Sequence, residues 1–164
     1  DIDTLIAHSM PEKLDDACYD NGELIFAEKV KPIAGWEFVK NWKPDDKKIR
    51  TRDNYVKVPM LTGKYPGKAL KFQFNGNAVG IAVAAGPDAG IIEFRIDGGK
   101  WEAQDLFTKH STTYHLPWYY TLADGLTSDM HILELRLINE KNKKSNGNVA
   151  RIRYFYVNKS KIEK

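Results

Sequence analysis

The sequence predicts an all-β protein folded as an antiparallel β-sandwich. Apolar residues alternate with polar ones over several short segments, which is the pattern of strands with one buried face. Gly, Asn and Asp separate these segments at intervals typical of sandwiches. Aromatic residues, which favour strands, make up 12% of the chain. Strand and helix patterns do not alternate, so a parallel α/β sheet is not expected, and 164 residues suffice for one domain with a full core.

The start of the chain differs from the rest. Ile2, Leu5 and Ile6 have helical spacing, and Pro11 ends that pattern. We interpret residues 1–19 as the end of a helix followed by an irregular connector. The expected organisation is a connector from an upstream domain over residues 1–22, a β-sandwich over residues 23–158 and a tail over residues 159–164.

The first predicted strands are short. Leu24 and Phe26 lie on one side of one strand, and residues 35–42 alternate in the same way. A polar loop follows over residues 44–53. Residues 55–58 then predict a further strand, which Pro59 marks as an edge or an end because proline cannot donate to a sheet ladder.

The clearest strand signal covers residues 69–85. Leu70, Phe72 and Phe74 alternate with polar residues, and Asn75-Gly76 follows directly. Because Asn and Gly both tolerate positive φ, a tight type I′ hairpin is expected at this point. Residues 78–85 are apolar on both faces and predict a central strand.

Further strands are predicted in the second half of the chain. Residues 92–96 and 100–103 form a second hairpin around Asp97-Gly98-Gly99, and residues 133–137 alternate between Leu and charged side chains. The last strand covers residues 150–157. Simple alternation places one group of its side chains (Ile152, Tyr154 and Tyr156) opposite another (Arg151 and Arg153).

Charge and composition exclude several classes of partner. A formal net charge of +3 is too small to indicate nucleic acid, and no apolar run is long enough to cross a bilayer. Cys18 is the single cysteine and cannot form an internal disulfide. We therefore expect neither a nucleic-acid partner nor a membrane partner.

The sequence lacks the common catalytic and cofactor motifs. It contains no Gly-x-Ser-x-Gly, His-Glu-x-x-His, P-loop or Gly-x-Gly-x-x-Gly, and its histidines lack helical metal spacing. We therefore expect no enzyme activity, no cofactor and no catalytic metal in this chain. Loop carboxylates such as Asp88, Asp97 and Asp105 leave a structural calcium ion as an alternative, although Asp in turns usually bonds its own backbone.

Aromatic residues provide the best candidate binding site. They gather in the segment YHLPWYY, and one tryptophan follows the Asp-Gly-Gly turn. Exposed aromatic rings can stack on the apolar face of a sugar, so the candidate ligand-binding residues are Trp101, Tyr114, Trp118 and Tyr119. The alternative is that the rings fill the core. Alternation supports this for part of the set, since Trp118 and Tyr120 must face opposite to Tyr119.

Four segments of the chain resemble a known domain type. They are GKALKFQFNGNAVGIAVAAGPDAGIIEFRIDGGKW, HLPWYYTLADGL, HILELRLINE and ARIRYFYVN, and together they cover roughly residues 67–158. This pattern is similar to the C-terminal accessory β-sandwich, of jelly-roll type, found in bacterial secreted SGNH/GDSL-type hydrolases. The matching positions include Gly76, residues 86–90, residues 97–99 and residues 131–135.

The N-terminal segment resembles the junction that follows the catalytic domain in such hydrolases. The matching residues are Met10, Pro11, Leu14, Asp15, Tyr19 and Gly22. The resemblance implies that the catalytic residues lie upstream of Asp1 and that the parent protein, a carbohydrate esterase, is secreted or periplasmic. The acidic start DIDTLIAHSMPEKL does not match a signal peptide, which leaves a cytoplasmic protein or a piece of a longer secreted one as alternatives.

Three functions are therefore compared. The first is a carbohydrate-binding module that holds a polysaccharide for an attached esterase. The second is a purely structural or dimerisation sandwich that packs on the catalytic domain. The third is an independent enzyme, which the lack of a nucleophile and base disfavours.

Overall fold

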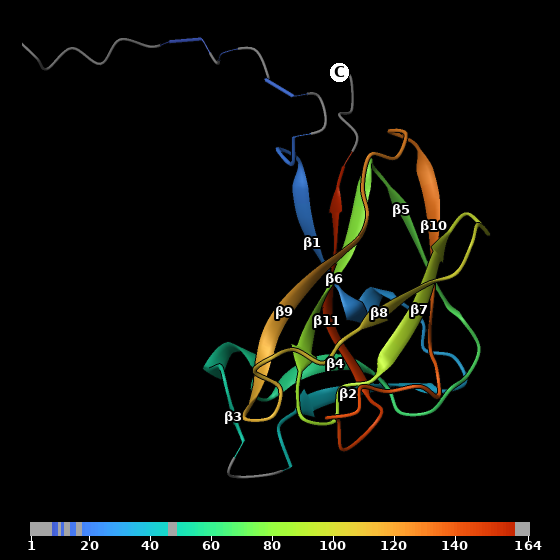
Figure 1. Ribbon diagram of the computed structural model, residues 1–164. Coiled ribbons are helices and arrows are strands. Elements are labelled where there is room, and N and C mark those ends of the chain that lie inside the picture. Colours follow the sequence, from blue (N-terminus) through green and yellow to red (C-terminus); the bar gives the residue numbers. More distant parts are fainter. Residues whose placement is uncertain (1–7, 10, 12–13, 16–17, 46–48, 160–164) are drawn as a thin grey trace, which may run out of the picture.

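Two β-sheets packed face to face make up the protein, as the sequence predicts. The computed structural model describes residues 8–9, 11, 14–15, 18–45 and 49–159 (Figure 1). A larger sheet has the strand order β2-β4-β11-β6-β9-β3, with β1 also paired to β11, and a smaller sheet has the order β5-β10-β7-β8. All pairings are antiparallel except β3 with β9. The all-β sandwich is thus confirmed.

The larger sheet consists of β1 (Gly22–Phe26), β2 (Trp36–Trp42), β3 (Arg50–Thr51), β4 (Val58–Gly63), β6 (Ala78–Ala85), β9 (Tyr114–Ala123) and β11 (Ala150–Asn158). The smaller sheet consists of β5 (Leu70–Asn75), β7 (Ile91–Ile96), β8 (Glu102–Asp105) and β10 (Met130–Leu137). Two short 3-10 helices, η1 (Ala27–Lys29) and η2 (Asp53–Tyr55), lie in the connections. In the described part of the chain, no helix is long and apolar enough to cross a bilayer.

The core lies between the sheets and is built from alternate side chains. Leu70, Phe72 and Phe74 of β5 are buried while the residues between them are exposed. Strand β6 is buried throughout, as expected for a central strand. The ring of Phe72 stacks on that of Phe155 from the opposite sheet, with 4.3 Å between the ring centres. The predicted second hairpin is also confirmed, since β7 pairs with β8.

The hairpin expected at Asn75-Gly76 is wrong. Strand β5 belongs to the smaller sheet and β6 to the larger one, so this connection crosses between the sheets. Gly76 has a φ of 150° and its N–H donates to the carbonyl of Asp129. A Cβ at Gly76 would lie 2.1 Å from the carbonyl oxygen of Asn158, so glycine is needed here for a close backbone approach rather than for a tight turn.

The strand expected over residues 55–58 is also displaced. Asp53–Tyr55 forms the 3-10 helix η2, and β4 begins only at Val58. Strand β4 is an interior strand, paired with β2 on one side and β11 on the other. Pro59 is tolerated because the pairing with β11 is limited to residues 61–63, so its missing N–H interrupts no ladder on that side.

Strand β11 does not alternate simply. Its register against β6 shifts between Ile152 and Tyr154, which marks a bulge. As a result Ile152 faces the core together with Phe155, whereas Tyr154 and Tyr156 face outward. The predicted grouping of Ile152 with the two tyrosines is therefore wrong, and this bulge creates the surface described below.

The N-terminal helix expected around Ile2, Leu5 and Ile6 lies outside the described residues. The strands themselves run from Gly22 to Asn158.

Candidate functional site

The outward surface of the larger sheet carries a group of exposed and half-buried apolar side chains. In one row across the strands, Phe26 of β1 is opposite Tyr154 of β11, Tyr154 is opposite Ala82 of β6, and Ala82 is opposite Tyr119 of β9. The next row runs Leu24, Tyr156, Gly80 and Thr121. We call the surface formed by Leu24, Phe26, Tyr119, Tyr154 and Tyr156 the aromatic face.

The aromatic face is open to solvent although its residues are large. Tyr119 is 54% exposed, Leu24 is 50% exposed and Phe26 is 45% exposed. The rings of Phe26 and Tyr154 lie 5.1 Å apart between centres, and those of Tyr119 and Tyr156 lie 6.2 Å apart. A contiguous group of exposed aromatic side chains on a folded domain indicates a binding surface more strongly than scattered single ones.

The absence of a side chain at Gly80, on the central strand β6, lets the ring of Tyr156 pack directly against the sheet. A Cβ at Gly80 would lie 2.2 Å from Cζ of Tyr156, so the phenol ring lies directly over Gly80. The Tyr156 hydroxyl reaches Thr121 of β9, with 2.9 Å between the two oxygens. Burial raises the pKa of the Tyr156 phenol, so its hydroxyl stays protonated at neutral pH. Tyr156 thus lies across the strands rather than standing out from them.

One end of the aromatic face is bounded by residues from two other elements. Tyr55 of η2 packs with Trp42, Met60 and Ala84 in a second apolar cluster on this side of the sheet. Arg153, at the β11 bulge, places its Cζ 4.8 Å from the centre of the Tyr154 ring and 5.3 Å from that of Phe26. The face therefore ends against a buried tyrosine and a guanidinium group.

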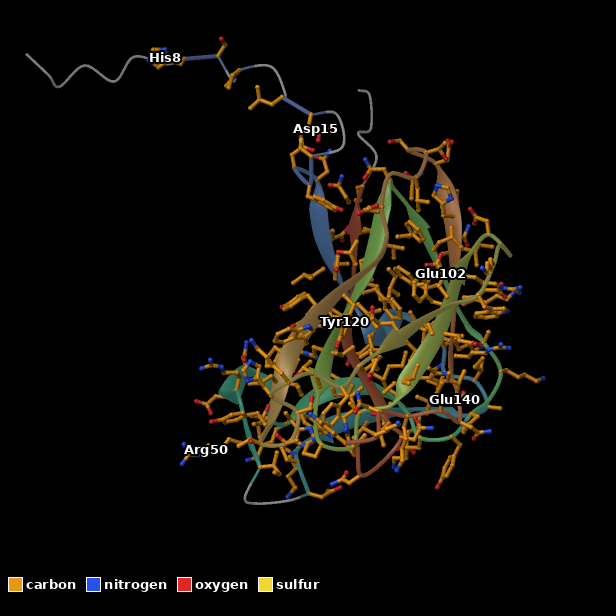
Figure 2. All side chains as sticks on the ribbon, viewed as in Figure 1. His8, Asp15, Arg50, Glu102, Tyr120 and Glu140 are labelled. Atoms are coloured by element: carbon orange, nitrogen blue, oxygen red, sulfur yellow. The ribbon has the colours of Figure 1, made fainter. Side chains whose placement is uncertain are left out.

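The structure separates the residues of the YHLPWYY segment, all of which lie on β9. Tyr119 belongs to the aromatic face. Trp118 and Tyr120 pack against the core on the opposite side, as alternation requires (Figure 2, in which Tyr120 is labelled). Tyr114 is exposed at the start of the strand, beside Arg50 of β3.

Trp101 lies away from these residues, next to the smaller sheet. Its ring contacts two guanidinium groups, with Cζ of Arg95 4.5 Å and Cζ of Arg136 4.1 Å from the ring centre. Arg95 donates to Glu134 at 2.5 Å, and Nε of Arg136 donates to Glu93 at 2.8 Å. The structure therefore does not bring Trp101 together with Tyr119.

Sequence reasoning did not single out Phe26, Tyr55, Arg153, Tyr154 or Tyr156. Phe26 and Tyr154 are far apart in sequence and meet only through the pairing of β1 with β11. The outward direction of Tyr154 and Tyr156 depends on the bulge in β11. The sequence contained one signal for this surface. Leu24, Ile25 and Phe26 are all apolar, and because side chains alternate along a strand, the three could not all face the core.

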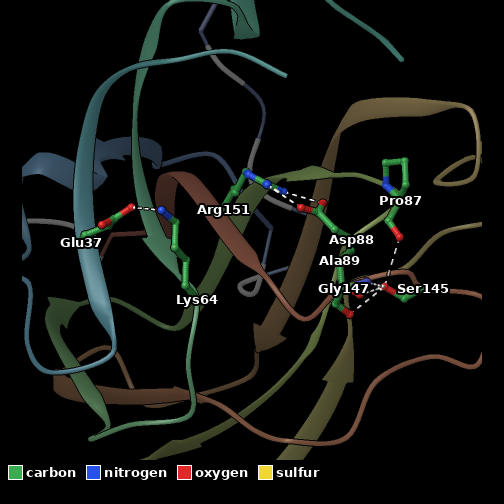
Figure 3. A network of polar contacts seen from close by, with 8 residues as sticks. All are labelled: Glu37, Lys64, Pro87, Asp88, Ala89, Ser145, Gly147 and Arg151. Atoms are coloured by element: carbon green, nitrogen blue, oxygen red, sulfur yellow. Dashed lines mark hydrogen bonds and ion pairs between the residues drawn. The ribbon is translucent and has the colours of Figure 1, made fainter. Parts of the chain in front are cut away.

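A polar pocket of about 220 Å³ lies at the loop end of the sandwich. Two of its side chains form an ion pair with two hydrogen bonds, in which Arg151 donates to Asp88 at 2.7 and 2.6 Å (Figure 3). Burial acts to raise the pKa of the Asp88 carboxyl, but the bonds from Arg151 hold this pKa below its usual value. Nearby, the Ser145 hydroxyl lies within hydrogen-bond distance of the carbonyl oxygens of Pro87, Ala89 and Gly147 (Figure 3). These contacts hold the loop around residues 86–90 against residues 145–147 and the start of β11.

One hydroxyl–histidine–carboxylate arrangement occurs at the end of the smaller sheet, but its geometry is structural. Nδ1 of His131 lies 2.7 Å from Asp97, and Nε2 lies 2.9 Å from the carbonyl oxygen of Thr127 and 3.3 Å from its hydroxyl. Because both ring nitrogens face acceptors, the surroundings favour the protonated ring, and Nε2 is directed at the Thr127 carbonyl oxygen rather than placed to take the hydroxyl proton. Across the described ranges, no group of three or more His, Cys, Asp or Glu residues could hold a metal ion.

The sandwich has counterparts among solved structures. It is similar to part of a two-domain esterase active on acetylated mannans, with a TM-score of 0.66 and 13% identity over 99% of this chain and 43% of that chain. A second structure of such an esterase, co-crystallised with mannopentaose, gives a TM-score of 0.63 and 14% identity, covering 96% of this chain and 41% of the esterase. A Paenibacillus xanthan lyase gives a TM-score of 0.55 and 18% identity over 93% of this chain and 14% of the lyase.

These similarities establish the fold and not the activity. The chain spans less than half of the esterase it resembles. No family model matches the sequence, and comparison with curated proteins gives no match either.

Proposed function

We propose that this chain is a non-catalytic, carbohydrate-binding accessory module of a bacterial SGNH/GDSL-type carbohydrate esterase. The observation that carries the proposal is the aromatic face. Phe26, Tyr154, Tyr156 and Tyr119 come from β1, β11 and β9 and form one surface across the small residues of β6, which lies between β11 and β9. The C–H groups on one side of a pyranose ring stack favourably on such rings, and the phenol hydroxyls can bond the sugar hydroxyls at its edge.

The parent protein is part of the proposal. The similarity to one portion of a two-domain esterase supports an attached catalytic domain, and the motif resemblance supports the SGNH/GDSL type. In such a parent the chemistry lies outside this chain, and the sandwich holds the polysaccharide near the catalytic residues. A secreted or periplasmic location fits this role because polysaccharide substrates lie outside the cytoplasm.

The alternative is a structural module whose aromatic face docks on the catalytic domain or on a second copy. Leu24 and Phe26 favour this alternative, since both are about half exposed and carry no polar side-chain atom. The three tyrosines favour the glycan, since each presents a hydroxyl beside its apolar ring. Direct binding measurements separate the two functions.

Affinity electrophoresis of the isolated chain through gels containing mannan or other plant and bacterial polysaccharides tests the proposal. We expect retention by at least one polymer, and a loss of about tenfold in affinity for Tyr119→Ala, which corresponds to about 1.4 kcal/mol. Phe26→Ala should weaken retention similarly. Tyr65→Ala is the matched control, because Tyr65 is 71% exposed and is not part of the aromatic face.

The outcome that contradicts glycan binding is equally concrete. If no polymer retards the wild-type chain, the binding role is excluded. Docking is then supported if Phe26→Asp shifts a concentration-dependent dimer to monomer in sedimentation velocity. An unchanged monomer would instead leave the catalytic domain as the docking partner, which is tested by binding to the separately expressed parent catalytic domain.

A further inference from the structure

Two buried polar groups without matching partners lie at the end of the aromatic face. Arg153 is 9% exposed and Tyr55 is 2% exposed. Nε of Arg153 is buried without a hydrogen-bond partner among the described residues, and the Tyr55 hydroxyl is buried beside the Tyr119 hydroxyl without a well-formed hydrogen bond. Buried donors are normally satisfied, so two neighbouring exceptions beside an exposed aromatic surface call for an explanation.

Arg153 occupies a gap in the larger sheet. Along one side of β11, β1 pairs with residues 154–158 and β4 pairs with residues 150–152, so neither strand covers position 153. The guanidinium donates from Nη1 to the carbonyl of Pro59 at 3.0 Å and otherwise contacts the rings of Phe26 and Tyr154.

Within the described residues, Arg153 forms no ion pair. The other arginine buried to a similar degree, Arg151, makes two bonds to Asp88. A buried cation is normally paired with an anion because removing it from water is costly. Arg153 therefore has a positive charge that an anionic ligand on the aromatic face could neutralise.

Tyr55 adds a hydrogen-bond donor at the same end of the face. Burial raises the pKa of the Tyr55 phenol most, the Tyr119 hydroxyl raises it further through its charge and a hydrogen bond, and the positive charge of Arg153 acts to lower it. Tyr55 packs against Met60, and Arg153 donates to the carbonyl of the preceding residue, Pro59, so both side chains lie beside the same part of β4. The raised pKa keeps the Tyr55 hydroxyl protonated at neutral pH. A protonated phenol and a guanidinium together provide donors for one acidic group.

We propose that the aromatic face binds an acidic polysaccharide, and that Arg153 and Tyr55 form the subsite for the carboxylate of a uronate residue. This inference rests on the proposed glycan binding and specifies its ligand class. A sugar stacked on Tyr154 and Phe26 has its ring edge near the guanidinium, whose Cζ is about as far from these ring centres as the two rings are from each other. Arginine suits a carboxylate because its planar fork matches the two oxygens.

The test compares two polymers that share a backbone. Polymannuronate carries one carboxylate on each sugar, and chemical reduction of these carboxyl groups converts it to neutral β-1,4-mannan. We expect the wild-type chain to bind polymannuronate at least tenfold more tightly than the reduced polymer in isothermal titration at 50 mM salt. The difference should shrink at 500 mM salt because the charge interaction is screened.

Two variants of the subsite sharpen this test. Tyr55→Phe removes only the hydroxyl and should lower the affinity for polymannuronate about fivefold while leaving binding of the reduced polymer unchanged. Arg153→Gln should abolish the preference for the charged polymer. Tyr120→Phe is the control, because it removes a phenol hydroxyl from the opposite side of β9. Since Arg153→Gln also removes a bond to Pro59, its melting temperature is measured in parallel, and Tyr55→Phe decides the question if Arg153→Gln does not fold.

The outcomes distinguish this inference from the proposed function. Equal affinity for both polymers, with Tyr55→Phe indistinguishable from wild type, overturns the carboxylate subsite while leaving a neutral glycan as ligand. Failure to bind either polymer or any other polysaccharide overturns both. A preference for polymannuronate that survives both Tyr55→Phe and a folded Arg153→Gln shows that the carboxylate is recognised elsewhere, and the subsite is then rejected.

Discussion

The outward faces of the two sheets have the same backbone pattern but opposite chemistry. On the smaller sheet, five charged side chains form ion pairs with one another, namely Lys71, Glu93, Arg95, Glu134 and Arg136, and Trp101 contacts both arginines. On the larger sheet, the corresponding positions carry the aromatic face. Charged groups on the first face satisfy each other, whereas the exposed rings on the second remain available. The contrast explains why we place binding on the larger sheet.

The larger sheet also has a charged pair on the same outward side, at the loop end of the sandwich. This Asp88–Arg151 pair is largely removed from water, with side-chain exposures of 26% and 10%, whereas the side chains of Lys71 and Arg136 on the smaller sheet are 67% and 39% exposed. The Arg95–Glu134 pair is buried to a similar degree, with side-chain exposures of 28% and 9%. Breaking the Asp88–Arg151 pair should therefore cost more stability than breaking an exposed ion pair.

The largest expected effect comes from breaking this pair. Asp88→Asn leaves Arg151 buried beside a neutral amide and should lower the free energy of unfolding by about 3 kcal/mol. For a chain of this size, this corresponds to a melting temperature lower by about 6–12 °C, measured by differential scanning calorimetry.

The control is Glu37→Gln in the exposed Glu37–Lys64 pair, where both side chains are about half exposed (Figure 3). Solvent screens such pairs, so the expected change is below about 0.5 kcal/mol. Equal effects of Asp88→Asn and Glu37→Gln would contradict the distinction between the two pairs.

A second prediction concerns the floor of the aromatic face. Gly80→Ala places a methyl group against the Tyr156 ring and 2.4 Å from the carbonyl oxygen of Tyr120, so the ring or the strand must move. We expect a loss of about 2 kcal/mol in stability, measured by urea unfolding, and weaker glycan binding. Gly22→Ala is the control, since the nearest atom to its added methyl is 3.7 Å away. Retention of wild-type stability by Gly80→Ala would show that Tyr156 does not lie closely over this strand.

A third prediction compares one aromatic residue on each face, and the two variants should have opposite effects on stability and on glycan binding. Trp101→Ala removes a half-buried ring that contacts two guanidinium groups, and should cost about 1–2 kcal/mol of stability without changing glycan affinity. Tyr119→Ala, at an exposed position, should reduce affinity while changing stability by about 0.5 kcal/mol or less. Reduced glycan binding by Trp101→Ala would move the site to the smaller sheet and end the contrast between the faces.

Much of the sandwich follows from alternation in the sequence. The buried face of β5, the central position of β6 and the hairpin between β7 and β8 are all visible in the pattern of apolar and turn residues. Alternation also places Tyr119 opposite to Trp118 and Tyr120. These features are local, so each can be predicted from neighbouring residues alone.

The remaining features depend on contacts between distant segments. The dipeptide Asn75-Gly76 predicts a position that tolerates positive φ. Whether β5 and β6 pair with each other or enter different sheets depends on their pairing with distant strands. The bulge in β11 has no clear sequence signature, although it turns Tyr154 and Tyr156 outward. Phe26 joins the aromatic face only because β1 pairs with β11. The candidate site was therefore predicted at Tyr119, while its surroundings required the structure.

The smallest expected effect is pH-dependent and belongs to the smaller sheet. The carboxylate of Asp97 raises the pKa of His131, and its hydrogen bonds with the His131 ring and the Ile132 N–H lower its own pKa. The stabilisation from His131 is complete below its unfolded pKa of about 6.5 and is lost as the pH rises through the higher folded value. The stabilisation from Asp97 is present above its unfolded pKa of about 3.9 and is lost as the pH falls through the lower folded value.

Asp97→Asn tests this pair with little change in the backbone. Asp97 has a φ of 51°, a conformation that asparagine also tolerates, and the amide oxygen can still accept the N–H of Ile132. Since Asp97 is half exposed, we expect a loss of about 1 kcal/mol or less near pH 5, decreasing at alkaline pH once His131 has lost its proton. Urea unfolding at the two pH values measures the difference. A loss that is constant with pH would show that the turn geometry, and not the ion pair, accounts for the role of Asp97, and that ion pairing on this sheet is confined to its outward face.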